Sequence, residues 1–169
     1  FDNLFGTGAG QIPAGAIIQS VSLSVYVTNA DALDFVALHR MLQPWTEAST
    51  FDSLISGVST GGAEAGSALL TFSAGSTGWN HLSSAQLTAT VQAWANGEAN
   101  HGWAFISDNA DLWTFASSEN GTVSQRPYLS VSYVLPQAPV VAVSGTATSY
   151  TENSAPVAVD PALCKKCGA

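Results

Sequence analysis

The chain has 169 residues, of which 46% are hydrophobic and only 9% are charged, and its net charge is −8. This length suits one domain with an appendage, and the hydrophobic content is sufficient for a substantial core. Ten of the twelve acidic residues, but only Arg40 and Arg126 among the four basic ones, precede residue 135. An acidic domain without lysine is a poor partner for nucleic acid and for anionic membranes. The chain also contains no apolar run of about 18 residues that would insert into a membrane.

The first half of the chain predicts short strands separated by loops. Glycines and Pro13 indicate a loop over residues 1–15. Residues 17–28 form the longest predicted strand, because apolar side chains occupy every second position from Ile17 and only Gln19 interrupts that face. A long surface loop is expected over residues 52–66, and shorter strands are predicted at residues 35–42, 68–72 and 79–82.

Residues 83–97 carry the signals of one short helix. Ser83 or Ser84 can cap its N-terminus, and Gly97 suits the position after its last turn. Apolar side chains recur at helical spacing, namely Leu87, Val91 and Trp94. The alternative is a strand, which is favoured by the β-branched residues Thr88, Thr90 and Val91. We predict the helix.

The residues that follow predict three more strands. Residues 101–107 and 112–117 are expected to pair as a hairpin around a polar turn at residues 108–111, and residues 129–134 close the domain. Many short strands with frequent turns are typical of an antiparallel sandwich. We therefore predict an all-β fold over residues 1–134, an antiparallel jelly-roll-type β-sandwich with one short helix.

The composition changes after residue 134. Residues 135–145 begin with two prolines and are predicted to be a linker; residues 146–163 are predicted to be the start of a further repeat or an added strand. Residues 164–169 form a tail with the only cysteines, Cys164 and Cys167, and no second pair or haem-type histidine accompanies them. We expect a frayed or truncated tail and a main domain that no disulfide holds together.

The five tryptophans are the clearest sign of a binding surface, because exposed indole rings can stack on the C–H faces of sugars. Trp94 and Trp103 are expected in the core, since they fall on the predicted helix and on a predicted strand. Trp45, Trp79 and Trp113 are nearer to loops, and they are the predicted carbohydrate-binding residues.

Acidic residues offer two further features. Asp108, Asn109 and Asp111 form an oxygen-rich turn that could bind a structural calcium ion, although such a turn is more often a simple Asx turn. Glu119 and Arg126 flank an Asn-Gly turn, and we predict that they form a structural ion pair.

The three histidines provide an alternative metal site. Three histidines can bind zinc, but the spacing of His39, His81 and His101 matches no zinc motif. Without zinc, we expect His39 to point outward, and the other two to hydrogen-bond to loop backbone. Glu47 is expected to accept hydrogen bonds from loop amides, with duty as a general base as a distant alternative.

The chain contains four segments in order, FDNLFGTGAGQIPAGAIIQSVSLSVYV, LHRMLQPWTEAST, TATVQAWANGEANHGWAF and FASSENGTVSQRPYLSVSY. Together they resemble the DNRLRE domain, which is related to carbohydrate-binding module family 96. The resemblance covers residues 1–134 and implies a jelly-roll sandwich that serves as an accessory module of secreted or cell-surface bacterial proteins. Some members bind polysaccharides such as alginate. The later segment YTENSAPVAVDPAL resembles the opening of a cadherin-like repeat.

Domains of this family begin with strands that precede the segment matching residues 1–5. The resemblance therefore implies that this chain is a fragment without its N-terminal strands. A sheet that lacks strands exposes an edge, which the strand-like segments at residues 140–143 and 146–150, or a second chain, could cover. Self-association through this edge is therefore an expected property.

The sequence predicts a non-catalytic accessory module that binds carbohydrate and is extracellular or at the cell surface. Two alternatives remain open. One is a structural or assembly module that self-associates through an incomplete sheet, and the other is a metal-dependent hydrolase that uses histidines and acidic residues. No residue is assigned a catalytic role, and the nucleophile motif G-x-S-x-G is absent.

Overall fold

The computed structural model describes residues 1–136, except residues 2, 31–34, 55–56, 74 and 108–112. The chain divides into two compact units, Phe1–Gln137 and Ala138–Ala169. The second unit lies outside the described residues. The predictions for the linker after residue 136, for the added strand or repeat, and for Cys164 and Cys167 therefore lie outside them too.

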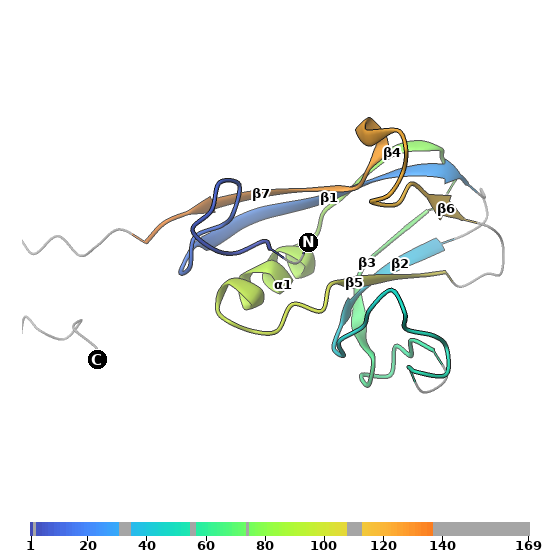
Figure 1. Cartoon of the computed structure of the whole chain (residues 1–169), viewed down its shortest axis with the longest axis horizontal. Coiled ribbons are helices and arrows are strands. Elements are labelled where there is room, and N and C mark those ends of the chain that lie inside the picture. Colours follow the sequence, from blue (N-terminus) through green and yellow to red (C-terminus); the bar gives the residue numbers. More distant parts are fainter. Residues whose placement is uncertain (2, 31–34, 55–56, 74, 108–112, 137–169) are drawn as a thin grey trace, which may run out of the picture. The chain divides into compact units, whose positions relative to one another are not determined.

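The described residues form seven strands, one α-helix and one short 3-10 helix (Figure 1). In chain order these are β1 (Ile17–Asn29), β2 (Phe35–Met41), β3 (Ala65–Ser73), β4 (Gly78–Leu82), α1 (Ala85–Ala95), β5 (Trp103–Ser107), β6 (Thr114–Phe115), η1 (Val123–Gln125) and β7 (Tyr128–Val134).

The strands form two antiparallel sheets, which confirms the predicted all-β sandwich with one short helix. β1 is the centre of the first sheet. β4 pairs with one edge of β1, and β7 and then β6 pair with the other, since Leu23 and Val27 each have a partner on both sides. The second sheet has the order β3-β2-β5.

The inward face of β1 is as predicted except at its beginning. Val21 and Val25 are almost completely buried, but Ile17 is 51% exposed and Ile18 is buried in its place. The register between β1 and β7 shifts between Ile18 and Ser20. This irregularity changes which alternate residues face the core, and it explains why Gln19 interrupts the sequence pattern.

Helix α1 covers the beginning of β1 (Figure 1). The Gln92 side chain joins the two elements, because its Oε1 accepts a hydrogen bond of 2.8 Å from the Ile18 N–H, and its Nε2 donates one of 3.2 Å to the Ala16 carbonyl. Leu87 and Val91 are completely buried on the inner side of the helix. The helix therefore closes the part of the core beneath the start of β1.

Both ends of α1 confirm the predicted caps. The Ser84 hydroxyl accepts a hydrogen bond of 2.9 Å from the Leu87 N–H. At the other end Gly97 has φ of +100°, and the Glu98 N–H donates a bond of 3.0 Å to the Ala93 carbonyl, as in a Schellman motif. These caps provide hydrogen-bond partners for backbone N–H and C=O groups that have no partner within the helix at its two ends.

Ser84→Ala should lower the free energy of unfolding by about 1 kcal/mol, because it removes the cap. The hydroxyl also donates a hydrogen bond of 3.0 Å to the Leu69 carbonyl in β3, so the helix would lose a tertiary contact as well. Urea denaturation measures the loss. Ser83→Ala at the exposed neighbouring position is the control, and it should change stability by less than about 0.5 kcal/mol. An equal loss in both variants would contradict the assignment of the cap.

The predicted hairpin of residues 101–107 with 112–117 is wrong. β5 pairs with β2 in the second sheet, whereas β6 pairs with β1 in the first. The connecting residues 108–112 lie outside the described residues. A turn signal shows that the chain can reverse, but not that the flanking strands pair with each other, and here both strands find partners far upstream in the sequence.

Glu64 closes the loop between β2 and β3, which is shorter than predicted because β3 begins at Ala65. The Glu64 carbonyl accepts a hydrogen bond of 2.8 Å from the Leu42 N–H, and its carboxylate accepts hydrogen bonds from the hydroxyl and the N–H of Ser59. The Ser59 hydroxyl is the main cause that lowers the pKa of Glu64.

This lowered pKa predicts a dependence of stability on pH. The folded state favours the ionised Glu64, so the carboxylate stabilises the fold at any pH above the pKa that it has in the unfolded chain. This stabilisation is lost as the pH falls through the lower folded pKa. Glu64→Gln should therefore reduce stability at pH 7 and flatten the acid limb of the stability profile, measured by urea denaturation. Ser59→Ala should also reduce the loss of stability at acid pH. If Ser59→Ala loses as much stability at acid pH as the wild type does, the Ser59 hydroxyl is not the cause of the lowered pKa.

Candidate functional site

The structure does not bring the three histidines together. His39 is in the second sheet and His81 in the first, and the described part of the chain contains no group of three His, Cys, Asp or Glu side chains that could hold a metal ion. The His81 Nδ1 is 2.8 Å from the Ser24 hydroxyl, a side chain of β1 and not the predicted loop backbone. His101 lies at the mouth of a pocket.

The prediction that His39 points outward is wrong. His39 is 6% exposed, and its Nδ1–H donates a hydrogen bond of 2.8 Å to the Gly66 carbonyl. The pairing of β2 with β3 is irregular on both sides of His39, so Leu38 and His39 are both buried although they are adjacent. The hydrogen bond gives the buried ring a structural role.

Glu119 and Arg126 do not form the predicted ion pair within the described structure. The Nε of Arg126 donates a hydrogen bond of 2.9 Å to the Asn120 carbonyl instead. The Ser118 hydroxyl is the main cause that lowers the pKa of Glu119, and the charge of Arg126 is the weakest cause. An ion pair among the described residues joins Arg40 to Glu98 at 2.9 Å. The candidate calcium ligands, Asp108, Asn109 and Asp111, lie outside the described residues.

The tryptophans divide into core and surface residues. Trp94 is buried and Trp103 packs against the core, both as predicted. Trp113 is also partly buried against the core, with ring centroids 5.1 to 5.8 Å from those of three phenylalanines, so it offers less surface to a ligand. Trp45 and Trp79 are 50% and 37% exposed and remain available to a ligand.

Trp79 is part of an aromatic cluster on the outer face of the first sheet. We call this cluster the aromatic platform, and it consists of Tyr26, Trp79, His81 and Tyr128. The strand register places these side chains on one face, because Tyr26 is opposite Trp79 while Ser24 is opposite both His81 and Tyr128. Neighbouring residues of β1, such as Val25, face the core.

The rings of the aromatic platform contact one another across the central strand. The Trp79 ring centroid lies 5.1 Å from that of Tyr128 and 5.5 Å from that of Tyr26, and the His81 ring is parallel to the indole within 9° at 6.2 Å. Ser24 is only 1% exposed beneath them. A small residue at this position leaves room for rings from β4 and β7 to meet above it.

Hydroxyl groups continue the outer face beyond the platform. Ser22 is opposite Ser130, and Ser20 is opposite Ser132, so four serines of β1 and β7 point to the same side as the rings. Ser20, Ser130 and Ser132 are exposed. In the sequence, serines alternate with the apolar residues of β1, but this pattern does not show that Tyr26 and Tyr128 gather around Trp79.

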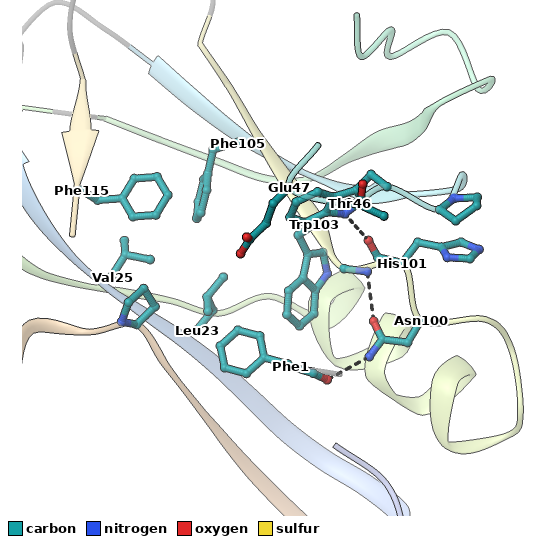
Figure 2. Close-up of a pocket in the computed structure, with 14 residues that line it drawn as sticks. Phe1, Leu23, Val25, Thr46, Glu47, Asn100, His101, Trp103, Phe105 and Phe115 are labelled. Carbon is teal, nitrogen blue, oxygen red and sulfur yellow. Dashed lines mark hydrogen bonds between the residues drawn. The ribbon is translucent and has the colours of Figure 1, made fainter. Parts of the chain in front are cut away.

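A second candidate site is a pocket of about 430 Å³ between the two sheets (Figure 2). Leu23 and Val25 of β1 and Phe115 of β6 line it on one side, and Trp103 and Phe105 of β5 line it on the other. We call it the inter-sheet pocket. Its lining is therefore mainly apolar and aromatic.

Hydrogen bonds join three chain segments at the mouth of the inter-sheet pocket. The Nε1 of Trp45 donates a hydrogen bond of 2.8 Å to the His101 carbonyl. The side chain of Asn100 accepts a bond of 3.0 Å from the Gly102 N–H and donates one of 3.3 Å to the Phe1 carbonyl (Figure 2). These bonds hold the mouth in one arrangement.

Comparison of the chain with protein-family models, curated proteins and solved structures finds no match. The similarity to the DNRLRE domain therefore depends on the four segments of residues 1–134 that resemble it, and it stays a prediction. Within the described ranges, no helix has the length and hydropathy that would be needed to cross a membrane.

Proposed function

We propose that this domain is a non-catalytic carbohydrate-binding module of a secreted or cell-surface protein, and that the aromatic platform is its binding face. The observation that supports this proposal is the exposed Trp79, which Tyr26 and Tyr128 hold in place at the surface of a sheet. Sugar rings present C–H faces that pack on aromatic rings, and a platform already ordered in the free protein loses little entropy on binding.

The adjacent serines supply the polar half of such a site. Sugar hydroxyls require donors and acceptors at their edges, and a serine hydroxyl provides both. Ser22 and Ser130 face each other two residues along β1 and β7 from Ser24 and Tyr128, so a chain of sugars that follows these strands would meet rings first and hydroxyls next. An extended polysaccharide fits this face better than a single sugar.

The charge of the domain predicts which polysaccharides bind. The chain has a net charge of −8, and both arginines of the domain are engaged, Arg40 with Glu98 and Arg126 with the Asn120 carbonyl. A negatively charged surface repels an anionic polymer. Neutral glycans should therefore bind more tightly than uronate-containing ones such as alginate.

Affinity electrophoresis on a panel of soluble neutral and acidic polysaccharides tests this function. We expect at least one neutral glycan to retard the protein and to change its tryptophan fluorescence. No retardation by any glycan, with a normal circular dichroism spectrum, would overturn the proposal. Light scattering after size exclusion measures the competing assembly function in the same samples, and the melting temperature with and without a chelator tests the predicted calcium ion.

A further inference from the structure

Glu47 differs from the other described glutamates because its carboxylate has no partner. Glu64 accepts hydrogen bonds from Ser59, Glu98 is paired with Arg40, and Glu119 accepts one from Ser118. Glu47 has neither a hydrogen bond nor an ion pair to any described residue, so the predicted bonds from loop amides are not formed. Its carboxylate instead points into the inter-sheet pocket (Figure 2).

Glu47 is an exposed residue, but the pocket that its carboxylate faces is lined by several aromatic rings. Trp103, Phe105 and Phe115 line the same pocket, and Trp45 lies at its mouth. A carboxylate gains little from apolar neighbours alone, whereas a cation between a carboxylate and aromatic faces is attracted by both. The chemistry of the pocket therefore suits a positively charged group that is carried on an apolar stem.

Neither arginine among the described residues supplies such a cation. The Arg40 guanidinium lies 5.9 Å from the centroid of the Trp94 ring and forms an ion pair with Glu98, and Arg126 is bonded to the Asn120 carbonyl. The pocket volume of about 430 Å³ accommodates a short alkyl chain. The net charge of −8 also raises the local concentration of cations near the surface.

We infer that the inter-sheet pocket binds a primary alkylammonium group, with Glu47 as its counter-ion and the aromatic side chains around its stem. A compact ammonium can donate to the carboxylate while its methylene groups contact Leu23, Val25 and the rings. Such a group occurs in free aliphatic amines and in lysine side chains. This site is separate from the aromatic platform and does not depend on glycan binding.

Titration of the full chain with butylammonium in phosphate buffer tests the inference, followed by the indole N–H signals in ¹H–¹⁵N spectra. The Trp45 and Trp103 signals should shift with one common Kd, whereas the Trp79 signal should not move. 1-Butanol, which has the same stem without the charge, should bind at least about tenfold more weakly. Equal affinity for the two probes, no shift, or an equal shift of Trp79 would overturn the inference.

Variants separate the counter-ion from the general charge of the domain. Glu47→Gln should weaken butylammonium binding by about tenfold or more. Asp52→Asn removes the same charge from the same loop. Asp52 is exposed and does not line the pocket, so this variant should change the Kd by less than about twofold. An equal effect of both variants would contradict the role of Glu47. Titration with Nα-acetyl-lysine methylamide then shows whether the pocket accepts a lysine side chain as well as a free amine.

Discussion

Trp79→Ala should weaken binding of the glycan that retards the wild-type protein by about 2 kcal/mol, or about 30-fold in Kd. Trp79 is the central ring of the aromatic platform, because it contacts Tyr26, His81 and Tyr128. Its removal takes away the stacking surface and also frees the neighbouring rings, which then have to be ordered on binding. Isothermal titration calorimetry with the identified glycan measures the loss.

The matched control for this prediction is Trp45→Ala. Trp45 is more exposed than Trp79, at 50% against 37%, but it lies at the mouth of the inter-sheet pocket. If the aromatic platform is the binding face, the Kd of Trp45→Ala for the glycan should stay within about threefold of the wild-type value. Loss of binding in Trp45→Ala with full binding in Trp79→Ala would indicate that the glycan binds at the inter-sheet pocket and not on the aromatic platform. The circular dichroism spectra of both variants establish that the domain is folded.

Leu87→Ala should lower the free energy of unfolding by about 3 kcal/mol, the largest effect on stability that we predict. Leu87 is completely buried, and it lies on the helix that closes the core beneath the start of β1. A shorter side chain would leave a cavity, because Ser84 and Gln92 hold the helix to β3 and β1 and limit its collapse. Urea denaturation at neutral pH gives the difference.

Gln86→Ala is the control on the exposed side of the same helix. Gln86 is exposed, and alanine has the highest helix propensity, so this variant should be at least as stable as the wild type within about 0.5 kcal/mol. If Leu87→Ala costs no more than Gln86→Ala, α1 does not contribute to the core as the structure indicates. Both variants should still bind the glycan when folded, because the platform is on the opposite face of the first sheet.

Some of the fold could be predicted because its signals are short-range. The caps of α1 depend on Ser84 and Gly97, which lie within a few residues of the helix ends that they satisfy. The alternation of β1 from Val21 onward reports which side is buried, because successive side chains point to opposite faces. The prediction for Ile17 was wrong where a bulge changed this alternation, and the polar Gln19 in the apolar series was the sign of that bulge in the sequence.

Pairing between strands, and with it the candidate sites, was decided at long range. The sequence by itself determined an all-β domain, the position of its helix, a buried Trp94 and an acidic charge. Only the tertiary structure separated β5 from β6, buried His39, packed Trp113 against the core, and gathered the aromatic platform from β1, β4 and β7. It also turned Glu47 toward the inter-sheet pocket. The physical reason is that burial patterns and caps depend on neighbours in the chain, whereas strand partners depend on which distant edges are free when the sheets assemble.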